Sequence, residues 1–279
     1  MGVHDSSYKL LFSYPHLVEC LIRGFVPGPW LDQLDFESLE TVSEAHPREN
    51  LGVRYDDVIW RLRWRSSGAW VYVYLMLELQ SRDDPFMAVR LLDYDGGLYR
   101  QLQRTLDLKS GDLLPIVLPV VLHTGQSPWT AKREVFDLIT PAPPEVEPYL
   151  PHLRYLLLDA HAYAADQLQA MRNPVACNLW LEASEVFLTE PIEVLHEILD
   201  PREHADLRRA YTLWLTQDFL PSRIRDANLE PVDDLKEVIV MMHENAIDWT
   251  LPWQEQGRRE GRQEGEAALL LRLLARQSL

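Results

Sequence analysis

The chain has 279 residues, of which 47% are apolar and 25% charged, which allows one large domain or two modest ones and excludes wholesale disorder. No stretch approaches the roughly 20 apolar residues that span a bilayer, and the N-terminus lacks the basic start and apolar run of a secretory signal. Cys20 and Cys177 stand alone, without a CxxC pair, which excludes a disulfide framework and argues against a thiolate zinc site. We therefore expect a cytoplasmic protein with reduced thiols and no membrane partner.

The net charge of −16 bears directly on nucleic-acid binding. An acidic protein gains no broad electrostatic attraction to DNA. Any binding to DNA would therefore depend on local basic clusters and on bound cations.

The first half of the chain predicts a helix followed by three strands. Residues 4–26 repeat apolar side chains at helical spacing, and Pro15 should break or kink that helix. Apolar alternation and runs then predict strands at 34–42, 53–65 and 70–80. The last of these is apolar on both faces until its end, which is typical of a central strand.

A second helix and a fourth strand follow. Asp84 is expected to be the N-cap and Pro85 the first residue of a helix that runs to about residue 106. Residues 115–123 predict a buried strand in which Pro119 is the awkward member. We expect an antiparallel meander of three strands, then a helical crossover to the fourth.

The second half predicts mainly helices. The proline-rich segment 127–152 indicates a surface connection or a domain boundary, and 153–159 predicts a short strand. Helices are expected at 161–172, 174–189, 191–199, 202–218 and 231–246. The segment 253–277 carries glycines at four-residue spacing in a charged setting, which favours a surface helix or a small oligomerisation helix. The expected division is a core at 1–159, a helical accessory region at 160–252 and a charged C-terminal helix at 253–279.

The residues that carry chemistry in this pattern are Asp57, Glu78 and Gln80. Glu78 and Gln80 are two apart on a predicted strand, so they point to the same face. Asp57 lies near the start of the preceding predicted strand, and in a hairpin the start of one strand faces the end of the next. Two converging carboxylates repel each other, and a hard divalent cation relieves that repulsion. Spacing alone leaves open the more common alternative, in which such acids are surface residues or partners of nearby arginines.

Several motifs in order resemble one family. They are HDSSYKLLFSYP at the start, then LDFESLE, RYDDVIWRLRW, VYLMLELQSRDDPFMAVRLLDY, LPVVLHTGQSPW and the glycine-spaced tail. Together they resemble the Rpn/YhgA-like family of recombination-promoting nucleases and transposases, within the PD-(D/E)XK nuclease superfamily. The resemblance implies an α/β fold with a mixed sheet, a restriction-endonuclease-like core of αβββαβ order and a mainly helical C-terminal region.

The resemblance also assigns roles. Asp57 takes the place of the PD aspartate, with Asp56 as the alternative, and Glu78 takes the place of the (D/E) residue. Both would bind Mg²⁺, with Mn²⁺ as a substitute. Gln80 stands where the general motif has lysine and would orient the attacking water, although glutamine can neither titrate nor supply a positive charge.

Four further residues are candidates for contact with the substrate. His4, Asp5 and Lys9 belong to the opening motif, and each has a structural alternative: Asp5 as a helix N-cap with His4 just outside it, and Lys9 as an exposed side chain. Arg82 would either bind the scissile phosphate or neutralise Glu78.

The sequence thus predicts a Mg²⁺-dependent DNA endonuclease linked to recombination or transposition. DNA is the expected partner, and the C-terminal helices are candidates for a homo-oligomer contact. The net charge and Gln80 motivate the alternative, an inactive interaction protein that keeps the nuclease scaffold. An RNA-directed nuclease is a third hypothesis.

Overall fold

The computed structural model describes residues 8–42, 58–78, 83–125, 127–184, 188–223 and 232–244, with the backbone alone for 74–78. All statements below concern this part of the chain. Within it, no helix is long and apolar enough to cross a membrane. Both cysteines are free thiols.

A mixed five-stranded sheet organises the fold. Its strands are β1 (Leu34–Thr41), β2 (Val58–Trp64), β3 (Trp70–Glu78), β4 (Ile116–His123) and β5 (Leu156–Asp159). They lie side by side in chain order. β1, β2 and β3 pair antiparallel, whereas β3, β4 and β5 pair parallel. The predicted meander, the helical crossover and the central place of β3 are all confirmed, as is the αβββαβ order of elements.

The strands β2 to β5 divide their side chains between two cores by alternation. On β2, Val58, Trp60 and Leu62 are buried in the larger core, whereas Ile59 packs against the smaller one on the opposite face. The Trp60 indole N–H donates to the carbonyl of Phe12 at 3.0 Å. That bond ties the first helical segment to the sheet while satisfying a buried polar group.

The predicted break at Pro15 is confirmed. A helical turn over 8–11 ends before the proline, and α2 (Pro15–Phe25) begins with Pro15 in its first turn. A proline is tolerated at that place because its missing N–H would have no partner within the helix. α2 turns Leu17, Val18 and Leu21 into the larger core.

The predicted start of the second helix is wrong. α3 spans Met87–Thr105 and its N-cap residue is Phe86, not Asp84. The Asp84 carboxylate instead accepts from the Phe86 N–H at 2.9 Å and pairs with Arg90 at 2.8 Å. Asp84 therefore closes a turn that contains Pro85, and the helix begins after that turn.

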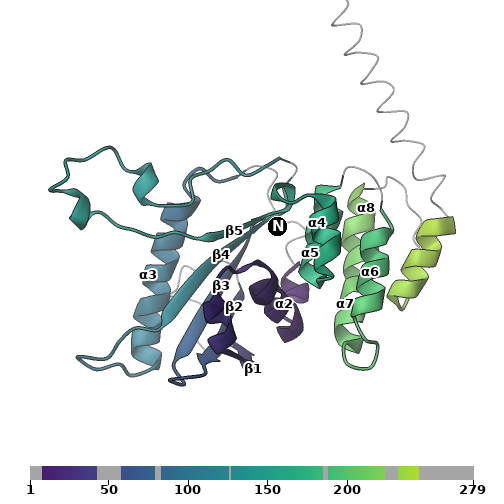
Figure 1. Cartoon of the computed structure of the whole chain (residues 1–279), viewed down its shortest axis with the longest axis horizontal. Helices are drawn as coiled ribbons and strands as arrows, with labels where there is room; N and C mark the ends of the chain where they lie inside the picture. The colour runs from purple at the N-terminus through teal and green to yellow at the C-terminus, as the bar shows by residue number, and fades with distance from the viewer. Residues whose placement is uncertain are drawn as a thin grey trace, which may run out of the picture.

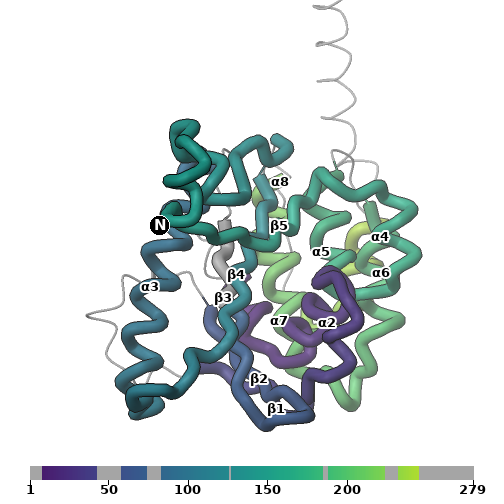
Figure 2. Tube along the Cα trace, turned by 60° about the vertical axis from the view of Figure 1, so that its left-hand side comes forward, coloured from purple at the N-terminus to yellow at the C-terminus, as the bar shows by residue number. Residues whose placement is uncertain are grey.

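Helices enclose the sheet on both faces (Figures 1 and 2). α3 covers one face and forms the smaller core with β3 and β4. The helices beyond the sheet lie toward the other face and share the larger core with α2 and the strands. They are α4 (Ala165–Met171), α5 (Pro174–Ala183), α6 (Glu190–Ile198), α7 (Ala205–Trp214) with a π turn over Leu215–Phe219, α8 (Leu220–Arg223) and a helix at 235–244.

Pro119 and the connection after β4 also follow the sequence prediction. β5 pairs with β4 only from Val120 onward. Pro119 therefore has no pairing partner in β5. The segment 127–152 holds two short 3₁₀ turns, η3 (Phe136–Leu138) and η4 (Glu147–Tyr149), and an isolated bridge from Glu134 to Arg154, before the chain returns to the sheet. The glycine-spaced segment 253–277 and its predicted oligomer contact lie outside the described residues.

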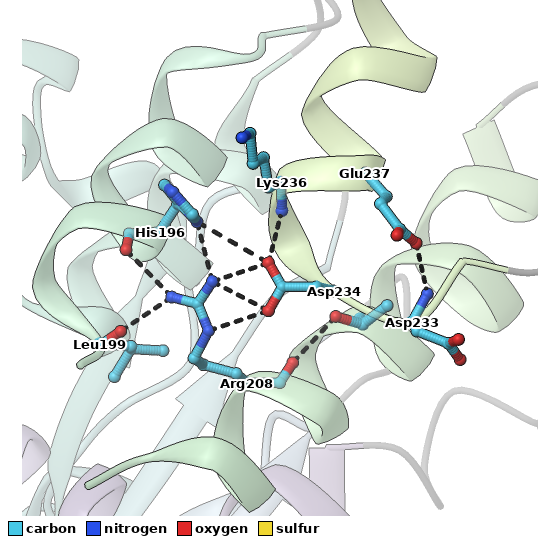
Figure 3. Close-up of polar contacts among 8 residues, drawn as sticks. His196, Leu199, Arg208, Asp233, Asp234, Lys236 and Glu237 are labelled. Carbon is cyan, nitrogen blue, oxygen red and sulfur yellow. Dashed lines mark hydrogen bonds and ion pairs between the residues drawn. The ribbon is translucent and has the colours of Figure 1, made fainter. Parts of the chain in front are cut away.

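One buried cation joins three of the helices (Figure 3). Arg208 of α7 is 4% exposed, and every nitrogen of its guanidinium group is hydrogen-bonded. It donates to the carbonyls of His196 and Leu199 at 3.0 and 2.8 Å, and to both oxygens of Asp234. Although burial opposes it, the hydrogen bonds from Arg208 lower the pKa of Asp234. The cation thereby fixes α6, α7 and the helix at 235–244 to one another.

Candidate functional site at the carboxyl edge of the sheet

The three parallel strands end in one row of polar residues. Glu78 closes β3 and pairs with His123 at the end of β4, which pairs with Asp159 at the end of β5. Each follows an apolar run. In open α/β sheets, ligands bind outside the carboxyl ends of the strands. The candidate site is therefore this edge, at which β2 also begins, since Val58 pairs with Leu75.

His123 is 1% exposed, and its ring is held by a hydrogen bond from Nε2. Its Nε2 lies 2.9 Å from the Ser127 carbonyl oxygen, so that nitrogen carries the proton. The ring meets Trp129 edge-on, with centroids 5.0 Å apart. In the described part of the chain the Nδ1 atom has no hydrogen-bond partner. His123 thus leaves one unpaired buried ring nitrogen beside the end of β3.

Asp159 accepts hydrogen bonds from two backbone N–H groups. One oxygen accepts from the Trp129 N–H at 2.9 Å, and the other accepts from the His161 N–H at 3.0 Å. His161 in turn places its Nε2 2.7 Å from the Gly125 carbonyl. Both carboxylate oxygens are therefore used to hold the chain that follows β4 and β5.

Asp83 fixes the same connection from the other side. Its Oδ2 accepts from the Thr130 N–H and hydroxyl, both at 2.7 Å, and from the Ala131 N–H at 2.6 Å. The hydrogen bond from the Thr130 side chain lowers the pKa of Asp83. We call the contacts of Asp83, His123 and Asp159 with residues 127–131 the edge clamp.

The structure places some of the predicted site residues and not others. The Glu78 backbone lies at the carboxyl end of β3, as expected. Lys9 lies half-buried in the first helical turn. The remaining candidates lie outside the described residues: Asp57 with its alternative Asp56, Gln80, His4, Asp5 and Arg82.

The metal expectation depends on side chains outside the described set. Within that set, no group of three or more His, Cys, Asp or Glu residues is placed to hold a metal ion. The carboxylates of Asp159 and Asp83 already accept N–H or O–H donors. A donor set of one or two carboxylates still suits Mg²⁺, which keeps several waters and takes further ligands from substrate phosphates. Asp57 and Glu78 are the residues that would form that set.

Two arginines in β2 have structural partners. Arg61 pairs with Glu40 at 2.6 Å, and its guanidinium carbon lies 4.2 Å from the ring centre of Trp70. Arg63 stacks on the same ring at 4.0 Å and donates to the Gly68 carbonyl. These contacts stabilise the hairpin of β2 and β3.

Sequence reasoning missed the edge clamp and the anchor of the N-terminal motif. The signal for the clamp was the HTGQSPW run, which begins at the last residue of β4. Its Trp129 is bound by Asp159, 30 positions away in the sequence. The anchor is Tyr8, whose hydroxyl donates to Glu182 of α5 at 2.7 Å; Glu182 in turn pairs with Arg223 of α8 at 3.2 Å. The opening motif is thus attached to the helical half of the molecule.

Sequence comparison shows the family to which the chain belongs. The family described as "Putative transposase, YhgA-like" matches residues 2–203. Since this is well over half of the sequence, the chain belongs to that family.

Among curated proteins the chain is similar to several from Escherichia coli. It is 27% identical over 130 residues to "Recombination-promoting nuclease RpnD" of strain O157:H7, covering 46% of this chain and 48% of that protein. From strain K12, "Recombination-promoting nuclease RpnA" is 24% identical over 171 residues, covering 61% and 56%. "Inactive recombination-promoting nuclease-like protein RpnE" is 25% identical over 171 residues, covering 61% and 54%. The chain thus spans about half the length of these relatives. No solved structure gives a significant match.

Proposed function

We propose that the protein is a metal-dependent DNA endonuclease of the PD-(D/E)XK type, linked to recombination or transposition. Asp57 and Glu78 bind Mg²⁺, and Gln80 orients the attacking water. The names of RpnD and RpnA support a nuclease, and Mn²⁺ is expected to replace Mg²⁺.

The observation that carries the proposal is the position of Glu78. It ends the central strand of the sheet, at the edge where three parallel strands finish and where β2 begins. A carboxylate after an apolar run is costly unless it is paired or binds a cation. Asp57 directly precedes Val58, the first residue of β2, so the proposal brings its carboxylate to the same edge.

The residues of this chain have separate tasks in the proposed reaction. The two carboxylates would hold the cation, which would supply an activated water and stabilise charge on the phosphate. Gln80 donates or accepts a hydrogen bond to place the water, since its amide cannot take up the proton. Arg82 and the residues His4, Asp5 and Lys9 are proposed contacts for the DNA backbone.

The test is plasmid cleavage with the isosteric variants Asp57→Asn and Glu78→Gln. Each removes a charged metal ligand, which is worth several kcal/mol, or about a thousandfold in rate. The matched control is Glu145→Gln, an exposed carboxylate in the connection after β4. Cleavage by both site variants at the rate of the control would remove the proposed centre.

A second candidate is an interaction protein that keeps the nuclease fold without the activity. The inactive designation of RpnE favours it, together with the net charge of −16. Calorimetric titration with Mg²⁺ separates the two candidates. Absence of metal binding, together with absence of DNA binding at low salt, would select the inactive protein.

A further inference from the structure

Three exposed basic residues gather in the connection between β4 and β5. They are Lys132, Arg133 and Arg154, which we call the basic cluster. An isolated antiparallel bridge pairs Glu134 with Arg154, and the Tyr155 N–H donates to the Arg133 carbonyl at 3.3 Å. The two stretches of chain therefore run side by side, and the three cationic side chains start from neighbouring backbone positions.

Hydrogen bonds fix the backbone under the basic cluster to the end of the sheet. The Trp129 N–H donates to Asp159, the last residue of β5, at 2.9 Å. The Trp129 indole N–H donates to the Tyr155 hydroxyl at 3.1 Å, and that hydroxyl donates to the Lys132 carbonyl at 3.3 Å. Side chains on a backbone that is already ordered lose less conformational freedom when they bind a partner. The basic cluster is in this sense pre-organised.

In the part of the chain that the structure describes, no carboxylate lies within ion-pair distance of the basic cluster. Three carboxylates beside the cluster already have donors. Asp84 pairs with Arg90 at 2.8 Å, and Glu134 lies 3.7 Å from His152. Asp83 accepts three hydrogen bonds from the first residues of the same connection. The three positive charges are therefore available to an external anion.

The basic cluster is accessible to a large partner. The connection extends past α3 at the left of Figure 1, whereas α4 to α8 lie at the right, so a partner can approach without meeting the helical half. Lys132 directly follows Ala131, which the edge clamp holds at the carboxyl edge of the sheet. A long anion that binds the cluster can therefore extend to that edge.

We propose that the basic cluster binds the phosphate backbone of duplex DNA beside the candidate site. The inference deepens the proposed function and rests on it, because it names the surface that holds the substrate. Arginine forms bidentate contacts to phosphate and lysine adds a point charge. Phosphate contacts carry no base information, so this surface provides affinity rather than sequence preference. It supplies the local positive charge that a chain of net charge −16 needs in order to bind DNA.

The binding experiment compares two triple variants that lose the same total charge. The test variant neutralises the basic cluster: Lys132→Gln, Arg133→Gln and Arg154→Gln. The control neutralises three exposed cations of the helical half: Arg202→Gln, Arg209→Gln and Lys236→Gln. Fluorescence anisotropy measures the Kd for a short labelled duplex in EDTA over a range of salt concentrations.

The test variant should bind the duplex at least tenfold more weakly than wild type at about 50 mM salt. Its slope of log affinity against log salt should be shallower by about 2.7, because each phosphate contact contributes about 0.9. The control should stay within about twofold of wild type, since its charges lie far from the cluster. Equal Kd values and equal slopes in the two variants overturn the proposal.

A second pair of variants separates the loss of charge from damage to the connection. The double variant Arg133→Lys with Arg154→Lys keeps both charges, whereas Arg133→Gln with Arg154→Gln removes them. We expect the lysine variant to keep the wild-type salt slope and the glutamine variant to lose about 1.8 from it. A slope that falls equally in both variants overturns the proposed role of charge.

Binding in EDTA also separates the failure of this inference from the failure of the proposed function. If the wild-type protein binds DNA through the cluster but does not cleave it with Mg²⁺, the surface is retained and the endonuclease is removed. If the wild-type protein cleaves and the test variant binds as the control does, the surface alone is overturned. A wild-type protein that binds no duplex at low salt overturns both.

Discussion

The buried polar groups around Arg208 in the helical half are more completely hydrogen-bonded than those on the sheet side. Around Arg208, each guanidinium nitrogen has an acceptor from α6 or from Asp234. On the sheet side, buried polar atoms lack hydrogen-bond partners in the described part of the chain, among them His123 Nδ1 and one oxygen of Asp95 in α3. Complete pairing is typical of structural networks, whereas unpaired buried groups call for a separate explanation. The comparison therefore sets one fully paired network, around Arg208, against a sheet side with hydrogen-bonding capacity left over; unpaired buried atoms also occur in α5, at Asn178 and Trp180.

The largest expected effect comes from breaking the complete network. Arg208→Met should lower the free energy of unfolding by about 3 kcal/mol, because the carbonyls of His196 and Leu199 lose their donor. Urea unfolding measures the loss. The control is Arg209→Met, since Arg209 is the exposed neighbour on the same helix. Equal stability of the two variants would show that the network does not hold the helices together.

A substitution on the sheet side is expected to raise the free energy of unfolding rather than lower it. Asp95 is 5% exposed and burial raises its pKa to about 6. The charged carboxylate therefore costs stability at neutral pH, and that cost is absent below pH 3.8, where the acid is protonated in both folded and unfolded states. Asp95→Asn should stabilise the protein by about 1–2 kcal/mol at pH 7 and by nearly nothing at pH 3.5.

Unfolding curves at both pH values measure this prediction. The control is Asp93→Asn, an exposed carboxylate on the same helix, which should show no comparable pH dependence. A gain from Asp95→Asn that is the same at both pH values would contradict a cost that arises from ionisation.

The smallest expected effect tests the link between the two regions. Tyr8→Phe removes the hydroxyl that donates to Glu182 but leaves the pair between Glu182 and Arg223. The loss should be about 1 kcal/mol in unfolding free energy. Thermal unfolding measures it, with Tyr149→Phe as the control, since Tyr149 is 86% exposed. A loss as large as that of Arg208→Met would show that Tyr8 carries far more than one hydrogen bond.

Local pattern predicted the elements better than their boundaries. The apolar alternation of β2 and the continuous apolar run of β3 indicated both strands and the central place of β3, because burial on one face or two determines those patterns. The start of α3 was wrong because Asp84 has two uses, as a cap or as a turn residue. The choice depends on Arg90, whose contact with Asp84 the pattern did not indicate.

Contacts between residues far apart in the chain could not be predicted from sequence patterns. Asp83 and Thr130 are separated by 47 positions, and Arg208 and Asp234 by 26. Neither pair follows from a periodicity of 2 or 3.6 residues, since both depend on how the helices and the connection pack. Glu78 was placed correctly at the end of β3 because a single charge after an apolar run is visible locally.

The shared larger core has a consequence for how the chain can be divided. Side chains of Trp60 in β2, Leu17 in α2 and Tyr211 in α7 belong to one buried cluster, and the Tyr8 and Trp214 rings lie 5.4 Å apart. A fragment that stopped after β5 would expose to water the apolar side chains of the larger core that the later helices cover. Such a fragment should aggregate or bind hydrophobic dyes, because the helices that follow serve as the second wall of the sheet's own interior.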